Sequence, residues 1–173
     1  MIYLAGDVDA EMYLNLMRRL DKRPNRINVM INSPGGHTCT GLGIYDRLKM
    51  VKDCTITANG DCSSAALLIL QAAKVRRATL HTSFVIHLSS VTTACECEEC
   101  KAHTPSAEDM AVKTCLDFIL QKVYRYRISE DSLVRALRQK CFGVEKALEW
   151  GIIDEIYTGE KVQKMDFGGN SGR

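Results

Sequence analysis

The residue best suited to chemistry is Ser64, which lies in the stretch Gly60-Asp61-Cys62-Ser63-Ser64-Ala65-Ala66. This stretch joins an expected strand to an expected helix. Ser64 is therefore expected at a helix N-terminus, where free backbone N–H groups favour negative charge. Such a setting suits a serine that attacks a carbonyl, because the oxyanion formed beside it must be stabilised. The motif alone is more typical of a serine, Ser63 or Ser64, that only caps the helix.

Two further features could complete a site of this kind. The sequence Ser33-Pro34-Gly35-Gly36 ends another expected strand, and its glycines can turn with positive φ and bring N–H groups close to a ligand. The same residues are typical of a tight turn that binds nothing. His87 follows the apolar strand Phe84-Val85-Ile86. It is either a histidine satisfied within the core or a neutral imidazole that takes the serine proton.

A separate segment combines four soft ligands within nine residues, namely Cys95, Cys97, Cys100 and His103. This set could hold zinc, but Cys-x-Cys is tighter than the usual finger spacing, and the glutamates between the cysteines make the segment acidic. Free thiols, or disulfides under oxidation, are the alternatives, and no metal is expected. Cys54, Cys62 and Cys115 lie in apolar surroundings, where each is expected to act as a small core residue.

The hydrophobic pattern predicts the elements that must position these residues. It predicts strands at Ile2–Leu4, Ile27–Ile31, Thr55–Ala58, Phe84–Ile86 and Ile152–Ile156, with Gly60 ending the third. It predicts helices from Asp9 to Leu20, from Gly41 to Leu48, at Ala65–Ala73, at Met110–Tyr126, from Ser129 to Leu137 and at Val144–Trp150. Strands that alternate with helices predict a layered α/β fold with parallel pairing and right-handed crossovers.

Length and composition limit the classes of protein to consider. The chain has 173 residues and 46% hydrophobic residues, which suits one domain with a core; we expect it over residues 1–158, with a flexible tail over 159–173. A net charge of +2 does not indicate nucleic-acid binding. We interpret the basic residues Arg125, Arg127, Arg135 and Arg138 as a solvated helix surface. Without an apolar run near ~20 residues or a secretion signal, we expect no membrane contact and a cytoplasmic location.

Taken together, several segments resemble the signature of the Clp protease proteolytic subunit, the ClpP family. They are Ile31-Asn32-Ser33-Pro34-Gly35-Gly36, Gly41-x-Gly43-Ile44-Tyr45-Asp46, Gly60-x-x-x-Ser64, Ile86-His87 and the closing stretch Glu145 to Glu155. The resemblance runs from about Ile2 to Tyr157. It implies a ClpP/crotonase-like α/β fold, with layered sheets, surrounding helices and a protruding handle helix over about residues 88–126.

The resemblance also implies roles for individual residues. Ser64 would be the nucleophile, His87 the general base, and the backbone N–H groups of Gly36 and Ala65 the oxyanion hole. Family members are serine endopeptidases that act inside a self-compartmentalising chamber of stacked rings. We therefore expect a homo-oligomer, a peptide or unfolded-protein substrate, an ATP-driven unfoldase as partner, and no cofactor.

The sequence departs from the family at the third member of the triad, an aspartate before the closing stretch. Counting back without a gap puts Arg135 there, and one gap puts Ala136 there. Neither residue orients a histidine as a carboxylate does. Three accounts stay open. Asp131 or Glu130 serves from a shifted position, a Ser–His dyad works with weaker orientation, or the chain is a weak or inactive ring subunit with a structural role.

A second departure lies at the start of the sequence. The family normally has some tens of residues before the first strand, which contact the unfoldase. Their absence here leaves ring size and unfoldase docking open. A crotonase-type acyl-CoA enzyme is the third functional alternative, because that fold also pairs two N–H groups on a carbonyl oxygen. The pairing of Ser64 with His87 argues against it, since crotonases usually place carboxylates at the reacting centre.

Overall fold

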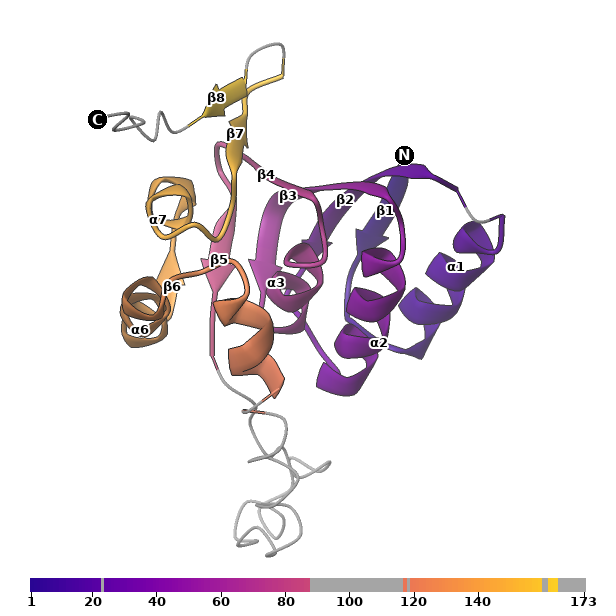
Figure 1. The fold of residues 1–173 in the computed structure, drawn as a ribbon, viewed down its shortest axis with the longest axis horizontal. Helices are drawn as coiled ribbons and strands as arrows, with labels where there is room; N and C mark the ends of the chain where they lie inside the picture. The colour runs from indigo at the N-terminus through magenta and orange to yellow at the C-terminus, as the bar shows by residue number, and fades with distance from the viewer. Residues whose placement is uncertain (23, 88–116, 118, 160–161, 165–173) are drawn as a thin grey trace, which may run out of the picture.

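The computed structural model describes residues 1–22, 24–87, 117, 119–159 and 162–164. Its centre is a sheet whose successive strands run in the order β1-β2-β3-β4-β7-β8 (Figure 1). These strands are β1 (Ile2–Ala5), β2 (Arg26–Ser33), β3 (Asp53–Ser63), β4 (Val75–Thr79), β7 (Glu155–Tyr157) and β8 (Val162–Lys164). The first five pair in parallel, and β8 pairs antiparallel with β7.

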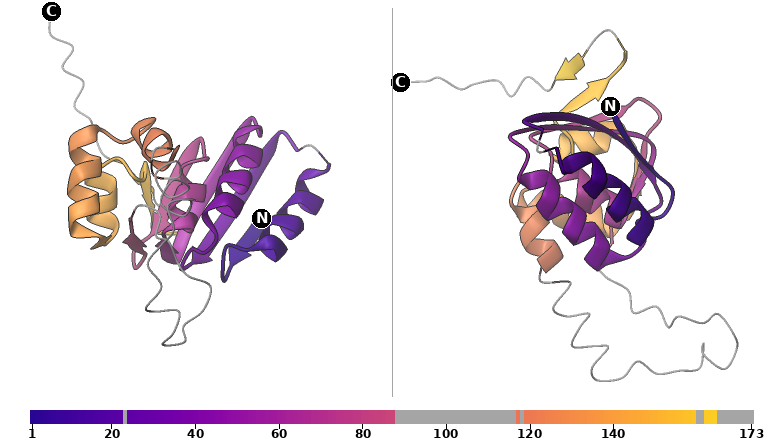
Figure 2. Two further views of the ribbon diagram at one scale, coloured as in Figure 1. Left: turned by 90° about the horizontal axis from the view of Figure 1, so that it is seen from below. Right: turned by 90° about the vertical axis from the view of Figure 1, so that its right-hand side faces the viewer.

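Three helices cover one face of this sheet: α1 (Ala10–Leu20), α2 (Thr38–Lys49) and α3 (Ala65–Leu70). They connect strands that advance in one direction across the sheet, and right-handed crossovers of that kind leave their helices on the same face. The two views of Figure 2 show this arrangement. The helices bury Leu16, Ile44 and Leu67 against the sheet, where Ile31 and Ile56 are also fully buried.

A second group of elements packs beside the end of β3. Strand β5 (Ser83–Val85) pairs in parallel with the last residues of β3, and β6 (Cys141–Phe142) pairs antiparallel with β5. Helices α6 (Glu130–Gln139) and α7 (Val144–Glu149) flank β6. Phe142 stacks on Phe84 at 5.8 Å between ring centroids and meets Trp150 edge-on at 5.0 Å. This aromatic column fixes β5, the strand that leads into His87.

Most predicted elements are confirmed, with corrections at their ends. Strand β3 continues through Gly60 instead of ending there. The predicted helix at Ala65–Ala73 ends as an α-helix at Leu70. Strand β4 was not predicted, because three basic residues within 74–77 hide its alternation.

The expected handle and the expected tail lie only partly within the described residues. Residues 117 and 119–125 are helical, as predicted, but the rest of the expected handle, from residue 88 to 116 and at 118, lies outside the described residues. Residues 162–164, expected to belong to the tail, form β8 instead, because they pair with Glu155, Ile156 and Tyr157 in a hairpin. The remainder of the tail, from residue 165, lies outside the described residues.

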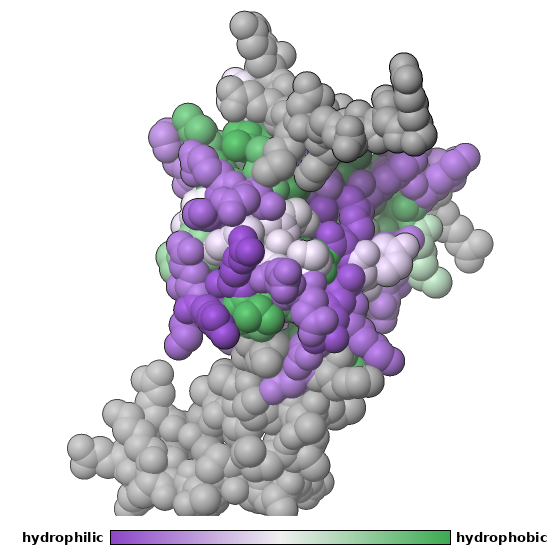
Figure 3. Space-filling model, turned by 60° about the vertical axis from the view of Figure 1, so that its left-hand side comes forward, coloured by the Kyte–Doolittle hydropathy of each residue, from purple (hydrophilic) through white to green (hydrophobic). Residues whose placement is uncertain are grey.

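The surface over α6 and α7 is largely hydrophilic in its described part (Figure 3). Arg135 and Arg138 are exposed there, as the interpretation of a solvated helix surface predicted. Arg127 is different, because it is committed to an ion pair with Asp154 at 3.0 Å. Within the described part of the chain, no helix combines the length and apolar character that crossing a membrane requires.

Candidate active site

Ser64 occupies the turn between β3 and α3 in a strained backbone conformation. Its φ is +52° and its ψ is −119°, a region that side-chain-bearing residues rarely adopt and that costs ~1–3 kcal/mol. Its side chain makes no capping hydrogen bond to α3, although it is the N-cap residue. The neighbouring hydroxyl of Ser63 donates to the Asp61 carboxylate instead. Helix capping therefore does not explain Ser64.

The loop at Gly35 lies directly against this serine. A Cβ added to Gly35 would lie 2.7 Å from the Ser64 Cβ and 3.1 Å from the Ala65 nitrogen. Gly35 has a φ of +102° and Gly36 a φ of +144°, so both use backbone freedom that glycine has. The Gly35 N–H donates to the buried Ser33 hydroxyl at 3.1 Å, which holds the loop in shape. Sequence reasoning did not foresee the contact between Gly35 and Ser64.

The backbone around Gly36 leaves its N–H available. Val8 donates its N–H to the Gly35 carbonyl at 2.7 Å and accepts the His37 N–H at 2.8 Å. These two bonds bracket Gly36, whose own N–H has no acceptor among the described residues, and the same holds for Ala65 at the first position of α3. Two unsatisfied donors beside a serine are what an oxyanion hole requires.

His87 follows the strand next to Ser64. The Ser64 N–H donates to the Val85 carbonyl at 2.8 Å, and Val85 pairs with Ser63 in the ladder between β3 and β5. His87 comes two residues after Val85 and is exposed. The two residues therefore leave the carboxyl ends of adjacent parallel strands, where side chains from neighbouring strands can meet.

The two candidate orienting carboxylates lie at the first turn of α6. Glu130 forms an ion pair with Arg125 at 2.8 Å, and Asp131 is exposed. The other end of α6 touches the strand that carries His87, since the Ile86 N–H donates to the Lys140 carbonyl at 2.9 Å. From Asp131 to Lys140 a helix rises ~13 Å. Ala136, the gapped counterpart of the family aspartate, is fully buried one turn before Lys140.

The cysteines fall into two groups. Cys54 and Cys62 are buried, as predicted, and burial raises the pKa of the Cys54 thiol to about 12. Cys39 and Cys141 are exposed. The candidate metal ligands Cys95, Cys97, Cys100 and His103, at which no metal was expected, and the predicted core residue Cys115 lie outside the described residues.

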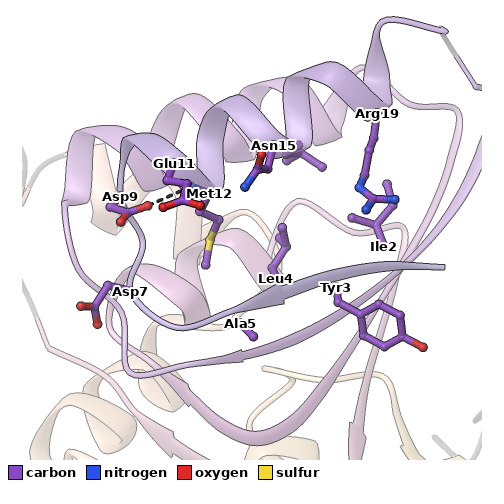
Figure 4. Close-up of a pocket in the computed structure, with 11 residues that line it drawn as sticks. Ile2, Tyr3, Leu4, Ala5, Asp7, Asp9, Glu11, Met12, Asn15 and Arg19 are labelled. Carbon is purple, nitrogen blue, oxygen red and sulfur yellow. Dashed lines mark hydrogen bonds between the residues drawn. The ribbon is translucent and has the colours of Figure 1, made fainter.

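One cavity of about 220 Å³ lies between β1 and α1, apart from Ser64 (Figure 4). Asp7, Asp9 and Glu11 line one end, and Arg19 lines the other. The Asp9 carboxylate is occupied as the cap of α1, accepting the Met12 N–H at 2.8 Å. The mixed charge and this structural use of Asp9 give the cavity no chemistry comparable to that at Ser64.

Fold and site together define an α/β protein that presents a serine on a strained strand-to-helix turn, against a glycine loop in which the Gly36 N–H has no acceptor among the described residues. The sequence model described as Clp protease matches residues 1–160, so the chain belongs to the Clp protease family. The fold agrees, since a structure of a ClpP1 mutant from Listeria monocytogenes matches with a TM-score of 0.69 at 23% identity, covering 92% of this chain and 91% of that one.

Two curated relatives show how far the sequence similarity extends. The ATP-dependent Clp protease proteolytic subunit 1 of Corynebacterium glutamicum is 28% identical over 170 residues, which cover 94% of this chain and 81% of that protein. The protein of the same name from Corynebacterium diphtheriae is 29% identical over 161 residues, covering 91% of this chain and 75% of the relative. The similarity thus includes both strand ends that carry Ser64 and His87.

Proposed function

We propose that this chain is a serine endopeptidase subunit in which Ser64 is the nucleophile. The observation that carries the proposal is the strained turn at Ser64, packed against Gly35 and free of any capping role. Strain of this kind persists where the surrounding structure enforces it, and it clusters at active sites. Membership of the Clp protease family gives the reaction class, hydrolysis of peptide bonds.

In the proposed mechanism, the Ser64 oxygen attacks the scissile carbonyl while His87 takes the hydroxyl proton. The N–H groups of Gly36 and Ala65 donate to the oxyanion of the tetrahedral intermediate. His87 then gives its proton to the leaving amine as the peptide C–N bond breaks, which leaves an acyl ester on Ser64. Water, deprotonated by His87, hydrolyses this ester and restores the free serine.

We further propose that the subunit acts within stacked rings of identical copies, on peptides or unfolded proteins. The support is the name of the two Corynebacterium relatives, ATP-dependent Clp protease proteolytic subunit 1. An ATP-driven unfoldase is the partner that this name implies. No metal or other cofactor takes part in the proposed chemistry.

The decisive experiment is covalent labelling with a fluorophosphonate probe followed by mass spectrometry of the labelled peptide. We expect the probe on Ser64, no label on Ser64→Ala, and at least 10²-fold slower labelling of His87→Ala. The controls Ser132→Ala and His81→Ala remove the same groups from α6 and from the exposed turn before β5. Labelling of Ser64→Ala at the rate of the intact protein would disprove the assignment.

A second candidate function is a weak or inactive ring subunit with a structural role. The observation that favours it is Ala136, a buried residue without a carboxylate at the gapped position of the family aspartate. Peptide hydrolysis by the purified protein alone, abolished by Ser64→Ala, would eliminate this candidate. The candidate would be supported if the purified protein does not hydrolyse peptides alone but changes the peptidase activity of an active family member when the two are mixed.

A further inference from the structure

Strand β3 carries two more residues than β2 just before it reaches Ser64. Ile31 pairs with Ala58, but Ser33, two residues on, pairs with Cys62, four residues on. The extra residues form a bulge around Gly60, which has a φ of +90°. A bulge of this kind shifts everything after it relative to the neighbouring strand.

The bulge decides which residue faces Ser64. With the shifted register, Gly35 is level with Ser64, and the 2.7 Å approach of a Gly35 Cβ to the Ser64 Cβ agrees with this. Without the two extra residues, Ser64 would move about 7 Å along the strand, at ~3.3 Å per residue, away from the Gly36 N–H. The alignment of nucleophile and oxyanion donor therefore depends on the bulge.

The side chain of Asn32 holds this bulge. Its Oδ1 accepts the Asp61 N–H at 3.0 Å. Its amide group also rests on Gly60, where an added Cβ would lie 3.0 to 3.2 Å from three atoms of the Asn32 side chain. On the far side of the bulge, the Asp61 carboxylate accepts the Ser63 hydroxyl. Asn32 and Asp61 thus form a clamp: it links β2, which leads into the glycine loop, to Ser63, the residue before Ser64.

We propose that Asn32 is a positioning residue that sets Ser64 against the Gly36 N–H by clamping the bulge in β3. The inference rests on the proposed function for its effect on catalysis, but the clamp itself is a property of the fold. A displacement of ~1 Å between reacting groups can cost about 10²-fold in rate. Loss of the clamp should therefore lower kcat and leave KM nearly unchanged, because the Asn32 side chain acts on Gly60 and Asp61 and so on the position of Ser64.

The test compares two variants of matched size. Asn32→Leu removes the acceptor, whereas Asn32→Asp keeps an oxygen that can accept the Asp61 N–H. We expect Asn32→Leu to lower kcat and the rate of fluorophosphonate labelling about 10- to 100-fold, and Asn32→Asp to recover most of the loss. Asn32 is exposed, so both variants should unfold at temperatures close to that of the intact protein. If Asn32→Leu does not fold, Gly60→Ala, whose Cβ displaces the Asn32 amide, gives the same expected loss.

Amide hydrogen exchange tests the clamp independently of activity. We expect faster exchange over residues 60–65 in Asn32→Leu than in either the intact protein or Asn32→Asp. Equal exchange in all three proteins overturns the inference, and so does labelling of Asn32→Leu at the intact rate. If the intact protein is not labelled at all, the proposed function fails, while the exchange comparison still decides the clamp.

Discussion

At the scale of single residues, the contact between Gly35 and Ser64 gives a direct test of the site. Gly35→Ala combines a positive φ with a Cβ 2.7 Å from the Ser64 Cβ and 2.8 Å from the Ser63 carbonyl oxygen. We expect labelling of Ser64 to fall at least 10²-fold, because the loop and the serine must separate.

Gly6→Ala is the matched control for Gly35→Ala. Gly6 has a similar φ of +84°, but a Cβ there meets nothing within 4 Å. This control should lower stability by ~1 kcal/mol through backbone strain and leave labelling intact. Unfolding midpoints and labelling rates measured together separate the two effects. Equal labelling of Gly35→Ala and Gly6→Ala would show that the collision at Ser64 does not matter.

Ala136→Asp tests whether the missing carboxylate limits activity. Ala136 lies one turn before Lys140, whose carbonyl binds the N–H of the residue preceding His87. A carboxylate there would lose its hydration, which costs free energy. This cost is offset only if the carboxylate pairs with the imidazolium that forms during the reaction. We expect kcat to rise at least 10-fold, within the ~10⁴-fold that an orienting aspartate contributes in trypsin-like enzymes.

The control for Ala136→Asp is Arg135→Asp, at the ungapped and exposed counterpart, which should leave kcat unchanged. A folded Ala136→Asp protein with unaltered kcat would mean that another group already orients His87. Asp131→Asn then becomes the informative variant, because Asp131 is exposed while Glu130 is paired with Arg125.

The sequence motifs made Ser64 and Gly36 candidate site residues, from a serine at a strand-to-helix turn and from paired glycines, but did not predict how they are held. The contact of Gly35 with Ser64 and the bond of Asn32 to Asp61 could not be predicted, because they depend on a register shift between β2 and β3 that only the paired strands show. A glycine such as Gly60 signals a break from sequence alone, whereas in the sheet it forms a bulge that lets the strand continue.

At the scale of elements, an ionic cluster joins β4 to the turn before β7. Arg76, with a side chain 3% exposed, bonds the Asp154 carboxylate through two nitrogens at 2.6 and 3.1 Å. Arg127 reaches the same carboxylate at 3.0 Å, and Gln71 accepts from Arg76 at 2.7 Å. Burial alone would raise the pKa of Asp154, but the bonds and charge of Arg76 outweigh it and lower the pKa below its ordinary value of 3.8.

Removing Asp154 should therefore destabilise the protein in a pH-dependent way. Asp154→Asn leaves Arg76 buried without its charge partner, and we expect a loss of ~3 kcal/mol in the free energy of unfolding at pH 7. Because the pKa of Asp154 is lower in the folded protein than its ordinary value of 3.8, the ionised carboxylate stabilises the fold fully at pH values above 3.8. This stabilisation is lost as the pH falls through the pKa of the folded protein. Denaturant titrations between pH 2 and pH 7 should show the difference between the two proteins shrinking below about pH 4.

The matched control for Asp154→Asn is Asp53→Asn, which breaks a more exposed pair with Lys74 and should lower stability far less, because solvent screens that pair. A pH-independent difference between intact protein and Asp154→Asn would contradict the ionic account.

The cluster also explains why sequence patterns missed β4. Its basic residues look like a surface segment, and only the distant Asp154 makes a buried Arg76 tolerable.

At the scale of the whole molecule, α1, α2 and α3 cover one face of the parallel sheet, and no helix of the described residues covers the opposite, open face. Parallel sheets almost always have both faces covered. The open face carries Tyr3, which is 69% exposed, and the half-buried Met30 and Thr57. Together with the proposed ring assembly, this predicts that a second copy of the chain covers the open face.

Sedimentation of the purified protein tests this prediction. We expect particles several times larger than the 19.3 kDa chain, and smaller particles for Met30→Arg, because a cation on the open face cannot be desolvated cheaply. Leu14→Arg is the matched control, since Leu14 is already 52% exposed on α1, away from that face. It should assemble like the intact protein. A chain that sediments as a monomer at all concentrations would contradict the ring, and a Met30→Arg protein that assembles normally would move the contact to another surface.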